Sequence, residues 1–377
     1  MTASSQPRSA YVHLPFCRHR CGYCNFTVIA GRDDLVASYL GALEREFGQF
    51  GFPHLLDTLY IGGGTPTHLS SHSWEHLLKV ILHWHVLQTN YEWTIEANPI
   101  DIQPELVDLL ADHGVTRISL GAQSFHNAKL KFLERDHDAQ TIRYAVDLCR
   151  SRFQSISLDL IFAAGKETLA DWEKDLQLAV ELEPDHLSTY GLTYEKGTAF
   201  WNRKNRGNLV AIDEQLERDM YESALDQLTT AGFQHYEVSS FARPNHRCRH
   251  NIVYWQGGEY LAAGAGAARF IAGCREINHR STTTYLKRIL AGESPVAERE
   301  QLSAEQIARD RLIFGLRMLE GINCNEFAKQ TGFTLEELAG KAIERFISAG
   351  LLTRDQSQLR VTREGLMMSD SMWPDLL

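Results

Sequence analysis

Cys17-Arg-His-Arg-Cys21-Gly-Tyr-Cys24 is the stretch that decides how this sequence is interpreted. Three cysteines at CxxxCxxC spacing can bind three irons of a [4Fe-4S] cluster, because such clusters are held by cysteine thiolates. The next cysteine is Cys149, far along the chain. The fourth iron is therefore predicted to lack a protein ligand and to be open to a small molecule. The alternatives are a chance group of thiols or a zinc site completed by His19 or by a remote residue, since structural zinc takes four ligands.

Length and charge exclude some classes of function. The chain has 377 residues, enough for two or three domains, and a formal net charge of −10. That charge argues against broad nucleic-acid binding, which requires phosphates to be neutralised by Lys and Arg. No apolar run is long enough to span a bilayer, although peripheral membrane association remains open. The first ten residues lack the apolar segment of a secretory signal, so a cytoplasmic location with reduced thiols is expected.

The first half of the chain alternates short β-rich runs with amphipathic helical patterns. The expected strands are 11–14, 58–61, 92–95, 117–120, 156–161 and 186–190. The expected helices are 35–50, 74–84, 104–112, 141–150 and 169–182. This alternation indicates βαβ units around a parallel sheet. We predict an α/β fold, a partial (β/α)6 TIM-like barrel with its chemistry at the C-terminal ends of the strands.

Polar and glycine residues recur at those strand ends. The cysteines follow the first strand and Gly62-Gly63-Gly64-Thr65 follows the second, whereas Glu96, Gln123 and Asp159 lie at the third, fourth and fifth. Glycine permits unusual backbone dihedrals and close approach to a ligand, but a tight turn stiffened by a following proline would also explain the run. The recurrence predicts that these residues gather around one mouth of the barrel.

Carboxylates and an arginine near that mouth have both a binding and a structural interpretation. A carboxylate suits the hydroxyls of a ribose, and an arginine can clamp a carboxylate with two hydrogen bonds. Arg135 could instead pair with Glu134 or Asp136 on the surface, and Asp159 could cap a turn. The residues alone leave both interpretations open.

The second half of the chain follows a different pattern. A helix is expected at 213–231, short strands or connectors at 233–241 and 252–255, and a linker at Pro295. Helices at 303–319, 325–331 and 335–349, then strands at 351–353 and 358–361, predict a winged-helix-like module. Packing or partner binding is favoured over DNA binding for this module, because the chain is acidic. The predicted domains are a barrel with the cluster at 1–200, an extension at 201–295 and the winged-helix-like domain at 296–377.

The cysteine motif, with the aromatic Tyr23 before its third cysteine, resembles that of the radical S-adenosylmethionine (SAM) superfamily. YVHLPFCRHRCGYCNF, GGGTPT, IEANP and RISLGAQSF narrow the resemblance to the group of oxygen-independent coproporphyrinogen III oxidases (HemN) and HemW haem chaperones. The resemblance implies that SAM chelates the open iron. One electron from the cluster then cleaves SAM to a 5′-deoxyadenosyl radical, so a reductant such as flavodoxin or ferredoxin is an expected partner.

The resemblance also implies site residues. Those expected to contact the cluster or SAM are Tyr11, Tyr23, Gly63, Gly64, Thr65, Glu96, Gln123, Arg135 and Asp159, with Cys17, Cys21 and Cys24 as cluster ligands. Gly63, Gly64 and Thr65 would hold the methionine end of SAM. One departure is IFAAGKET at 161–168, where relatives carry a loop with glycine and proline, so the conformation of this loop is open.

Two features separate the oxidase branch from the chaperone branch. Oxidases carry a fourth cysteine where Phe26 stands here, and they have a longer segment before the cysteines than the sixteen residues of this chain. The string His250-Asn251-Ile-Val-Tyr254-Trp255 resembles the haem-binding motif of the HemW group. Histidine is a common axial ligand of haem iron, and aromatic rings can lie against a porphyrin. A structural histidine with core aromatics is the alternative, and Cys248 is a rival ligand.

The sequence therefore predicts a haem chaperone of the HemW type. It would bind haem and a SAM-ligated [4Fe-4S] cluster, and would transfer haem to an acceptor protein such as a respiratory haem enzyme. The alternative is an oxygen-independent coproporphyrinogen III oxidase that decarboxylates propionates by radical chemistry. A third hypothesis is a winged-helix regulator that uses the cluster as a redox sensor. Whether SAM is cleaved is left open.

Overall fold

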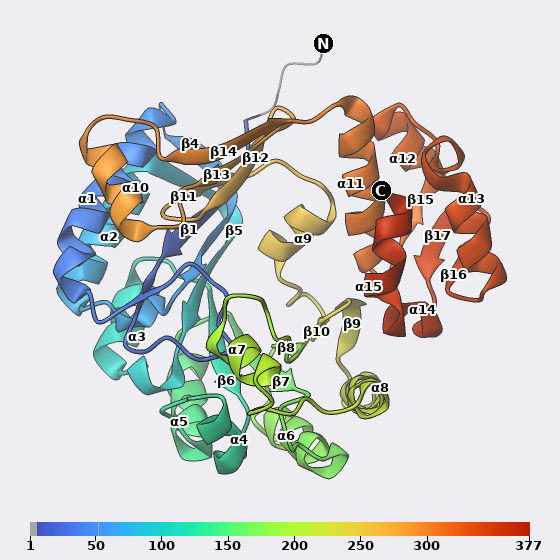
Figure 1. The fold of residues 1–377 in the computed structure, drawn as a ribbon. Coiled ribbons are helices and arrows are strands. Elements are labelled where there is room, and N and C mark those ends of the chain that lie inside the picture. Colours follow the sequence, from blue (N-terminus) through green and yellow to red (C-terminus); the bar gives the residue numbers. More distant parts are fainter. Residues whose placement is uncertain (1–5, 52) are drawn as a thin grey trace.

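The computed structural model describes residues 6–51 and 53–377, and its central feature is a nine-stranded sheet (Figure 1). Six parallel neighbours form the middle of the sheet: β1 (Ser9–Leu14), β4 (His54–Gly63), β5 (His85–Ala97), β6 (Arg117–Gln123), β7 (Ser155–Phe162) and β8 (His186–Gly191). One edge is extended by β11 (Leu261–Ala263), and the other by the antiparallel strands β10 (Ser240–Ala242) and β9 (Gln234–Glu237). Among the strands that the structure describes, the two edges of the sheet do not pair with each other. The predicted partial barrel is confirmed.

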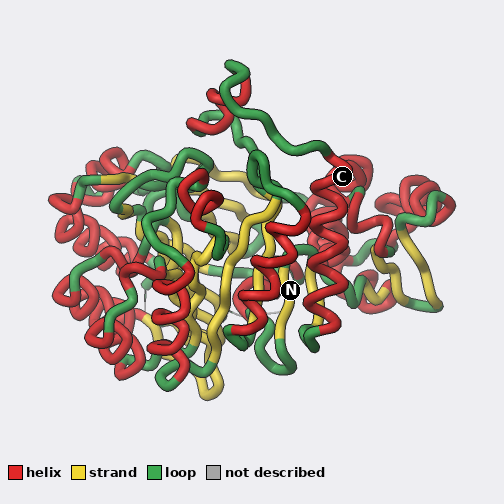
Figure 2. Tube along the Cα trace, turned by 90° about the horizontal axis from the view of Figure 1, so that it is seen from below, coloured by secondary structure: helices red, strands yellow, loops and turns green. Residues whose placement is uncertain are grey.

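Helices cover the outer face of this sheet, as Figure 2 shows from below. They are α1 (Val36–Gln49), α2 (Ser71–Trp84), α3 (Pro104–Asp112), α4 (Asn127–Phe132), α5 (Ala139–Arg150) and α6 (Leu169–Glu181). The cause is a two-residue period in the strands, which places alternate side chains on opposite faces. Leu59 and Ile61 of β4, and Trp93 and Ile95 of β5, are fully buried against the helices. Helix α6 begins with a capping box between Thr168 and Asp171.

The inner face of the same strands is polar. The alternate positions hold Thr58 and Tyr60, Thr94 and Glu96, Arg117 and Ser119, Ser157 and Asp159, and His186 and Ser188. Parallel sheets usually bury apolar residues on both faces. A polar inner face therefore needs hydrogen-bond partners or a ligand-filled space, and this sheet encloses a cavity there.

The segment after β8 differs from the structure expected from the sequence. It includes α7 (Ala199–Asn205), α8 (Glu214–Thr230) and α9 (Arg249–Trp255), so residues 252–255 are helical and the expected strand or connector is wrong. The aromatic and β-branched composition favours a strand. A tertiary contact overrides it: the Glu92 carboxylate on β5 accepts hydrogen bonds from the backbone N–H groups of Arg249 (3.0 Å) and His250 (2.9 Å). These are first-turn donors that lack a partner within the helix.

The expected linker at Pro295 is also wrong. Residues directly after it form β14 (Val296–Gln301), which pairs with β13 (Cys274–Asn278), and β13 pairs with β12 (Ala268–Ile271). The charged residues that suggested a linker are the exposed side chains of an edge strand, where charge is common. Helix α10 (Thr282–Leu290) connects this small sheet to the helices of the barrel.

The C-terminal module has its own core. Its elements are α11 (Ala304–Arg317), β15 (Ile322–Asn323), α12 (Cys324–Thr331), α13 (Leu335–Ser348), β16 (Leu352–Asp355), β17 (Gln358–Val361), α14 (Arg363–Met367) and α15 (Ser369–Met372). Leu312, Phe327 and Leu359 are buried together in it. The predicted helices and wing strands are confirmed, and α9 lies between this module and the barrel (Figure 1). Within the described residues no helix combines the length and apolarity needed to cross a bilayer.

Candidate functional site

The three cysteines of the first motif line one cavity of about 520 Å³ at the C-terminal ends of the barrel strands. Cys17 ends the two-residue strand β2 (Phe16–Cys17), which pairs with β3 (Ile29–Ala30) and closes the loop between them. All three thiols are free. Among the described residues no three His, Cys, Asp or Glu side chains are arranged to hold a single metal ion, so a ready-made zinc site is not offered. The three thiols share this cavity, and a cluster with three protein ligands stays a prediction from their spacing.

A carboxylate that the sequence analysis considered only as a partner of Arg135 holds the cysteine loop in place. Glu134 accepts hydrogen bonds from the backbone N–H of Gly22 (2.8 Å) and from His19 (3.0 Å), and pairs with Arg203 (3.1 Å). His19 is thus engaged by a carboxylate rather than directed at the thiols. Glu134 lies eleven residues after Gln123, and no local sequence pattern could have identified it.

Arg135 points at the cluster loop. One of its terminal nitrogens lies 3.8 Å from Sγ of Cys21, and the other donates to Oδ1 of Asn98 (3.0 Å) and to the carbonyl of Gly121 (3.2 Å). Its Nε is buried and has no hydrogen-bond partner among the described residues. The surface pairing considered for Arg135 is therefore not formed. An unpartnered buried donor of a charged group is costly and is suited to a ligand acceptor.

The glycine run is explained by three different neighbours. A Cβ on Gly62 would lie 2.7 Å from the Glu96 carboxylate, and one on Gly63 would lie 2.4 Å from the His13 ring. One on Gly64 would meet the Phe16 carbonyl oxygen at 2.6 Å. Gly63 also has a φ of 118°, which side-chain-bearing residues rarely adopt. The run lets strand β4 pass between the cysteine loop and the inner-face carboxylate, so it shapes the cavity wall.

Two carboxylates face the cavity, and burial raises the pKa of each. Glu96 accepts from the Gly63 N–H (2.9 Å) and the Tyr60 hydroxyl (2.9 Å), yet burial raises the pKa of Glu96 to about 7. Asp159 accepts from the Ser119 hydroxyl at 3.2 and 3.0 Å, and burial raises its pKa. Gln123 lines the same wall with a φ of 63°. Of the residues predicted to contact cluster or SAM, Tyr23, Gly63, Gly64, Thr65, Glu96, Gln123, Arg135 and Asp159 line this cavity.

Tyr11 lies apart from that group. Its hydroxyl is hydrogen-bonded to Nδ1 of His13 (2.9 Å), and its ring lines a second cavity on the other side of α9. His13 in turn contacts the carbonyl of Thr27 through Nε2 (2.7 Å), and burial lowers the pKa of His13 to about 4. His13 therefore stays neutral and ties β1 to the end of the cysteine loop.

His250 contacts the middle of β4, whereas the cysteines lie beyond the C-terminal end of that strand. Nδ1 of His250 is 2.9 Å from the hydroxyl of Thr58 at the start of the β4–β1 pairing, whereas Thr65, just past the end of β4, donates to Sγ of Cys17 at 3.5 Å. Five residues of strand separate Thr58 from Gly63, which corresponds to roughly 16 Å at about 3.3 Å per residue. His250 and the cysteine loop are thus separated along β4, although Tyr60 and Asn251 line the same cavity as the cysteines.

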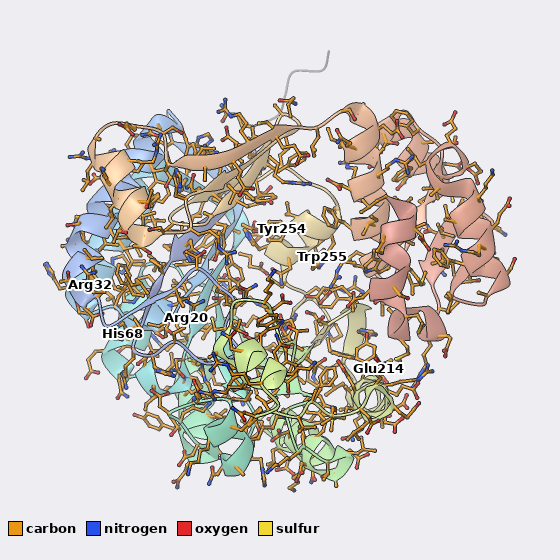
Figure 3. All side chains as sticks on the ribbon, in the orientation of Figure 1. Arg20, Arg32, His68, Glu214, Tyr254 and Trp255 are labelled. Atoms are coloured by element: carbon orange, nitrogen blue, oxygen red, sulfur yellow. The ribbon has the colours of Figure 1, made fainter. Side chains whose placement is uncertain are left out.

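His250 is buried between two aromatic rings. It stacks on Tyr60 with ring centroids 5.1 Å apart, and its Nε2 lies 2.7 Å from the hydroxyl of Tyr254. Burial lowers the pKa of His250 to about 3, so the imidazole is neutral. Asn251 lines the cluster cavity, whereas Tyr254 and Trp255 line the second cavity; Figure 3 shows both of these on α9 at the centre of the molecule. Cys248 lies 3.7 Å from Glu92.

Comparison with known proteins assigns the family. Residues 11–179 match the radical SAM superfamily, and residues 302–368 match the HemN C-terminal domain. The chain is 36% identical to the haem chaperone HemW of Lactococcus lactis, over 99% of this chain and 98% of that protein. It is 32% identical to the haem chaperone HemW of Bacillus subtilis, over 97% and 98%. The chain belongs to the HemW family. Membership in the radical SAM superfamily implies a [4Fe-4S] cluster and SAM.

The HemW-family chain shares its fold with a solved oxidase. The structure of coproporphyrinogen III oxidase (HemN) from Escherichia coli superimposes with a TM-score of 0.87 at 23% sequence identity. The match covers 98% of this chain and 90% of the oxidase. This likeness confirms the α/β fold with its C-terminal module, and at that identity it does not decide between chaperone and oxidase.

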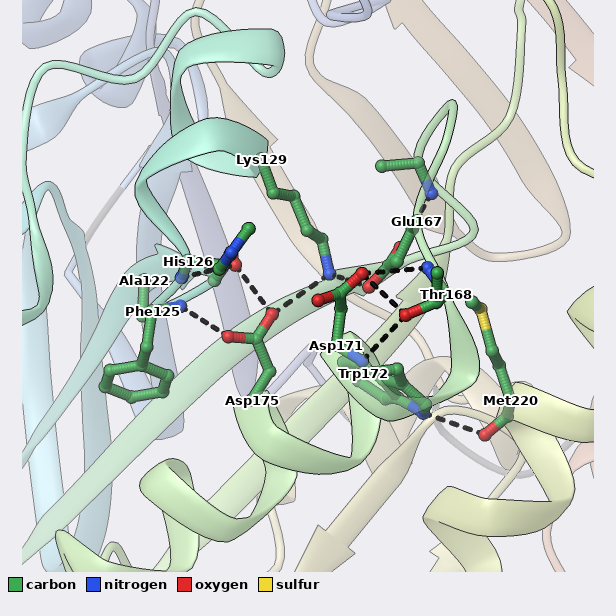
Figure 4. Close-up of polar contacts among 12 residues, drawn as sticks. Ala122, Phe125, His126, Lys129, Glu167, Thr168, Asp171, Trp172, Asp175 and Met220 are labelled. Carbon is green, nitrogen blue, oxygen red and sulfur yellow. Dashed lines mark hydrogen bonds and ion pairs between the residues drawn. The ribbon is translucent and has the colours of Figure 1, made fainter.

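A buried ion network supports the cluster side of the HemW-family barrel, and the sequence analysis missed it (Figure 4). Nζ of Lys129 on α4 contacts the carboxylates of Glu167 and Asp175 (3.1 Å for Asp175), and it lies 5.1 Å from the centroid of the Trp172 ring. Glu167 also accepts from the N–H of Ala164 (2.9 Å), so it orders the 161–168 loop. Helix α4 lies between Gln123 and Arg135 in the sequence, so this network positions both.

Proposed function

We propose that this protein is a haem chaperone of the HemW type, which binds haem and a SAM-ligated [4Fe-4S] cluster and passes haem to an acceptor protein. The observation that carries the proposal is similarity along nearly the whole chain to proteins named haem chaperone HemW, at up to 36% identity in those compared. An intact His250-Asn251-Ile-Val-Tyr254-Trp255 segment supports it. A respiratory haem enzyme is the proposed class of acceptor, and a cytoplasmic location suits the free thiols.

In this proposal Cys17, Cys21 and Cys24 bind the cluster, which supplies one-electron chemistry when SAM is bound. Burial raises the pKa of the Cys17 thiol to about 11, so metal binding must displace its proton. The unpartnered Nε of Arg135 is available to an acceptor atom of SAM beside the cluster. A flavodoxin or ferredoxin would reduce the cluster.

The remaining wall of the cavity would bind the rest of SAM. Gly63, Gly64 and Thr65 offer backbone groups close to the cysteine loop, and Tyr23 lies beside them in the same lining. Glu96 holds a carboxyl group whose acceptor oxygens suit a ribose diol, and its pKa near 7 lets it hold or release a proton at neutral pH. Gln123 and Asp159 would complete this polar wall. Tyr11, which lines the second cavity, would support the wall from its far side.

His250 is the proposed ligand of haem iron. Its low pKa keeps the imidazole neutral, which is the ligating form. Both ring nitrogens are engaged, Nδ1 by Thr58 and Nε2 by Tyr254. The Thr58 contact fixes the ring, and the Tyr254 hydroxyl must move away before Nε2 can bind iron. Asn251 and Trp255 would flank the site.

The separation of the two motifs favours a chaperone over the alternative oxidase. A propionate that loses a hydrogen atom to a radical must lie against SAM, whereas His250 lies about 16 Å along β4 from the cluster end. Phe26, which stands where oxidases carry a fourth cysteine, is 68% exposed at the rim of the cluster cavity. Sequence-specific DNA binding would instead favour the regulator hypothesis.

An anaerobic haem titration of the reconstituted protein tests the proposal. The wild type should give a shifted Soret band, His250→Ala should lose it, and the control His83→Ala, at an exposed position of helix α2, should keep it. The same samples should release no decarboxylated product from coproporphyrinogen III with SAM and a reductant. Turnover of coproporphyrinogen, or haem binding by wild type and His250→Ala alike, would contradict the proposal.

A further inference from the structure

A second cavity of about 490 Å³ lies between α9, the small sheet and the C-terminal module. Its walls come from Tyr254 and Trp255 on α9, Phe270 on β12, and Arg311 and Phe314 on α11. Among the described residues it shares no lining residue with the cluster cavity. Figures 1 and 3 show α9 bridging the space between the barrel and the module. The volume lies within the range of about 300 to 1,000 Å³ found for small-molecule sites.

The chemistry of the walls points to a flat aromatic ligand with acidic groups at one edge. Tyr254 and Tyr260 meet edge to face at 4.6 Å between ring centroids, and Phe270 and Phe314 add further ring surface. The Nε of Arg311 is buried without a hydrogen-bond partner within residues 6–51 and 53–377. The indole N–H of Trp255 is also buried without a partner in that part of the chain. Unsatisfied donors beside an aromatic slot are suited to carboxylates of a ligand.

Among the lining residues that the structure describes, Arg311 is the available cation. Arg275 also lines the cavity, but its guanidinium is paired with Asp310 at 2.5 Å, so each neutralises the other. Within the described part of the chain Arg311 makes one long hydrogen bond, 3.4 Å from Nη1 to Oε1 of Gln330. Its stem lies over Gly257, where a Cβ would meet Cγ of Arg311 at 2.5 Å. Gly257 thus lets the arginine lie flat along the cavity wall.

The phenol ring of Tyr254 separates the second cavity from His250. The Tyr254 hydroxyl occupies Nε2 of His250 at 2.7 Å, while the Tyr254 ring lines the cavity. A rotation of Tyr254 about its side-chain bonds would therefore expose Nε2 to the cavity. The Tyr60 ring stacks against the other side of the imidazole and lines the cluster cavity.

We propose that this second cavity is the porphyrin pocket, with the haem macrocycle between α9 and α11 and its propionates bound by Arg311. The inference rests on the proposed haem-binding function and locates its site. It gives the C-terminal module a defined role, because α11 supplies one wall of the pocket. It also places haem on the far side of α9 from the cluster, so haem can enter and leave without passing the SAM cavity.

Haem and haem dimethyl ester, which lacks the propionate charges, are the probes that test this pocket. Wild type should bind haem about tenfold more tightly than the ester, as expected for a charge-assisted contact. Arg311→Met should bind both ligands equally and at the affinity of wild type for the ester. Arg309→Met, on the same helix but outside the lining, should behave as wild type. Ala268→Trp, which fills the cavity from β12, should abolish binding of both ligands.

The outcomes separate this inference from the proposed function. If Arg311→Met and Ala268→Trp bind haem as wild type does while His250→Ala does not, the pocket is wrong and the chaperone proposal stands. If wild type binds no haem, both fail. Should Arg311→Met not fold, as judged by circular dichroism, the wild-type comparison still decides: equal affinities for haem and its ester would overturn the role of the arginine.

Discussion

Replacement of Lys129 by methionine should be one of the most destabilising single changes on the cluster side of the barrel. The lysine side chain is 4% exposed, and those of Glu167 and Asp175 are 2% exposed each. Without the cation, Asp175 keeps hydrogen bonds from the Ser124 hydroxyl (2.6 Å) and the Phe125 N–H (2.7 Å), whereas Glu167 keeps only the Ala164 N–H. Removing one partner of a buried ion pair costs about 3 to 5 kcal/mol.

Urea unfolding followed by circular dichroism measures this cost. We expect Lys129→Met to lose about 4 kcal/mol at pH 7, within the range for a broken buried ion pair, and the control Lys131→Met on the exposed face of α4 to lose no more than about 0.5 kcal/mol. Burial already raises the pKa of Glu167, and loss of the cation raises it further. The variant's deficit should therefore shrink as the pH falls and Glu167 takes up a proton. A deficit under about 1 kcal/mol at pH 7, or one independent of pH, would show that Lys129 does not stabilise the buried carboxylates as a cation.

Three further changes test the two cavities. Gly63→Ala should place a methyl group 2.4 Å from the His13 ring at a φ of 118°, and should cut the iron content after reconstitution by more than half; full iron loading would contradict the assigned wall. Glu96 has a folded pKa of about 7, above that of an unfolded carboxyl, so the apo protein should lose up to about 3 kcal/mol of stability as the pH rises from about 4.5 to 7. Urea titrations of Glu96→Gln should lack that loss, and an identical pH slope would show that Glu96 titrates normally. Tyr254→Phe leaves Nε2 of His250 without its 2.7 Å partner, so haem should bind severalfold faster in stopped-flow experiments; slower binding would argue against iron ligation at Nε2.

Much of the barrel was predictable because its rules are local. Period-two strands separated by amphipathic helices place the cysteines, the glycine run and Glu96 at the same edge of the sheet, and the structure brings them around one cavity. The winged-helix-like module followed from its pattern of three helices and two short strands, and the structure caps two of those helices with capping boxes at Ser303 and Thr334.

The remaining features depend on residues far apart in sequence. The local sequence of α9 predicts a strand. Its helical form depends on Glu92, which precedes it by more than 150 residues and accepts hydrogen bonds from its first N–H groups. The charged residues after Pro295 predict a linker, because their sequence gives no indication of the partner strand β13. Local sequence also gives no indication that Glu134 would bind Gly22, or that Arg311 would face Trp255 across a cavity.

The distance between the haem iron and the [4Fe-4S] cluster shows whether haem and SAM occupy separate cavities. If His250 binds haem iron from the second cavity, the two centres are separated along β4, whose five residues from Thr58 to Gly63 span roughly 16 Å. Pulsed electron paramagnetic resonance on protein loaded with both centres should give a separation greater than about 15 Å, unchanged by SAM. A separation below about 10 Å would place haem in the cluster cavity and would contradict the account.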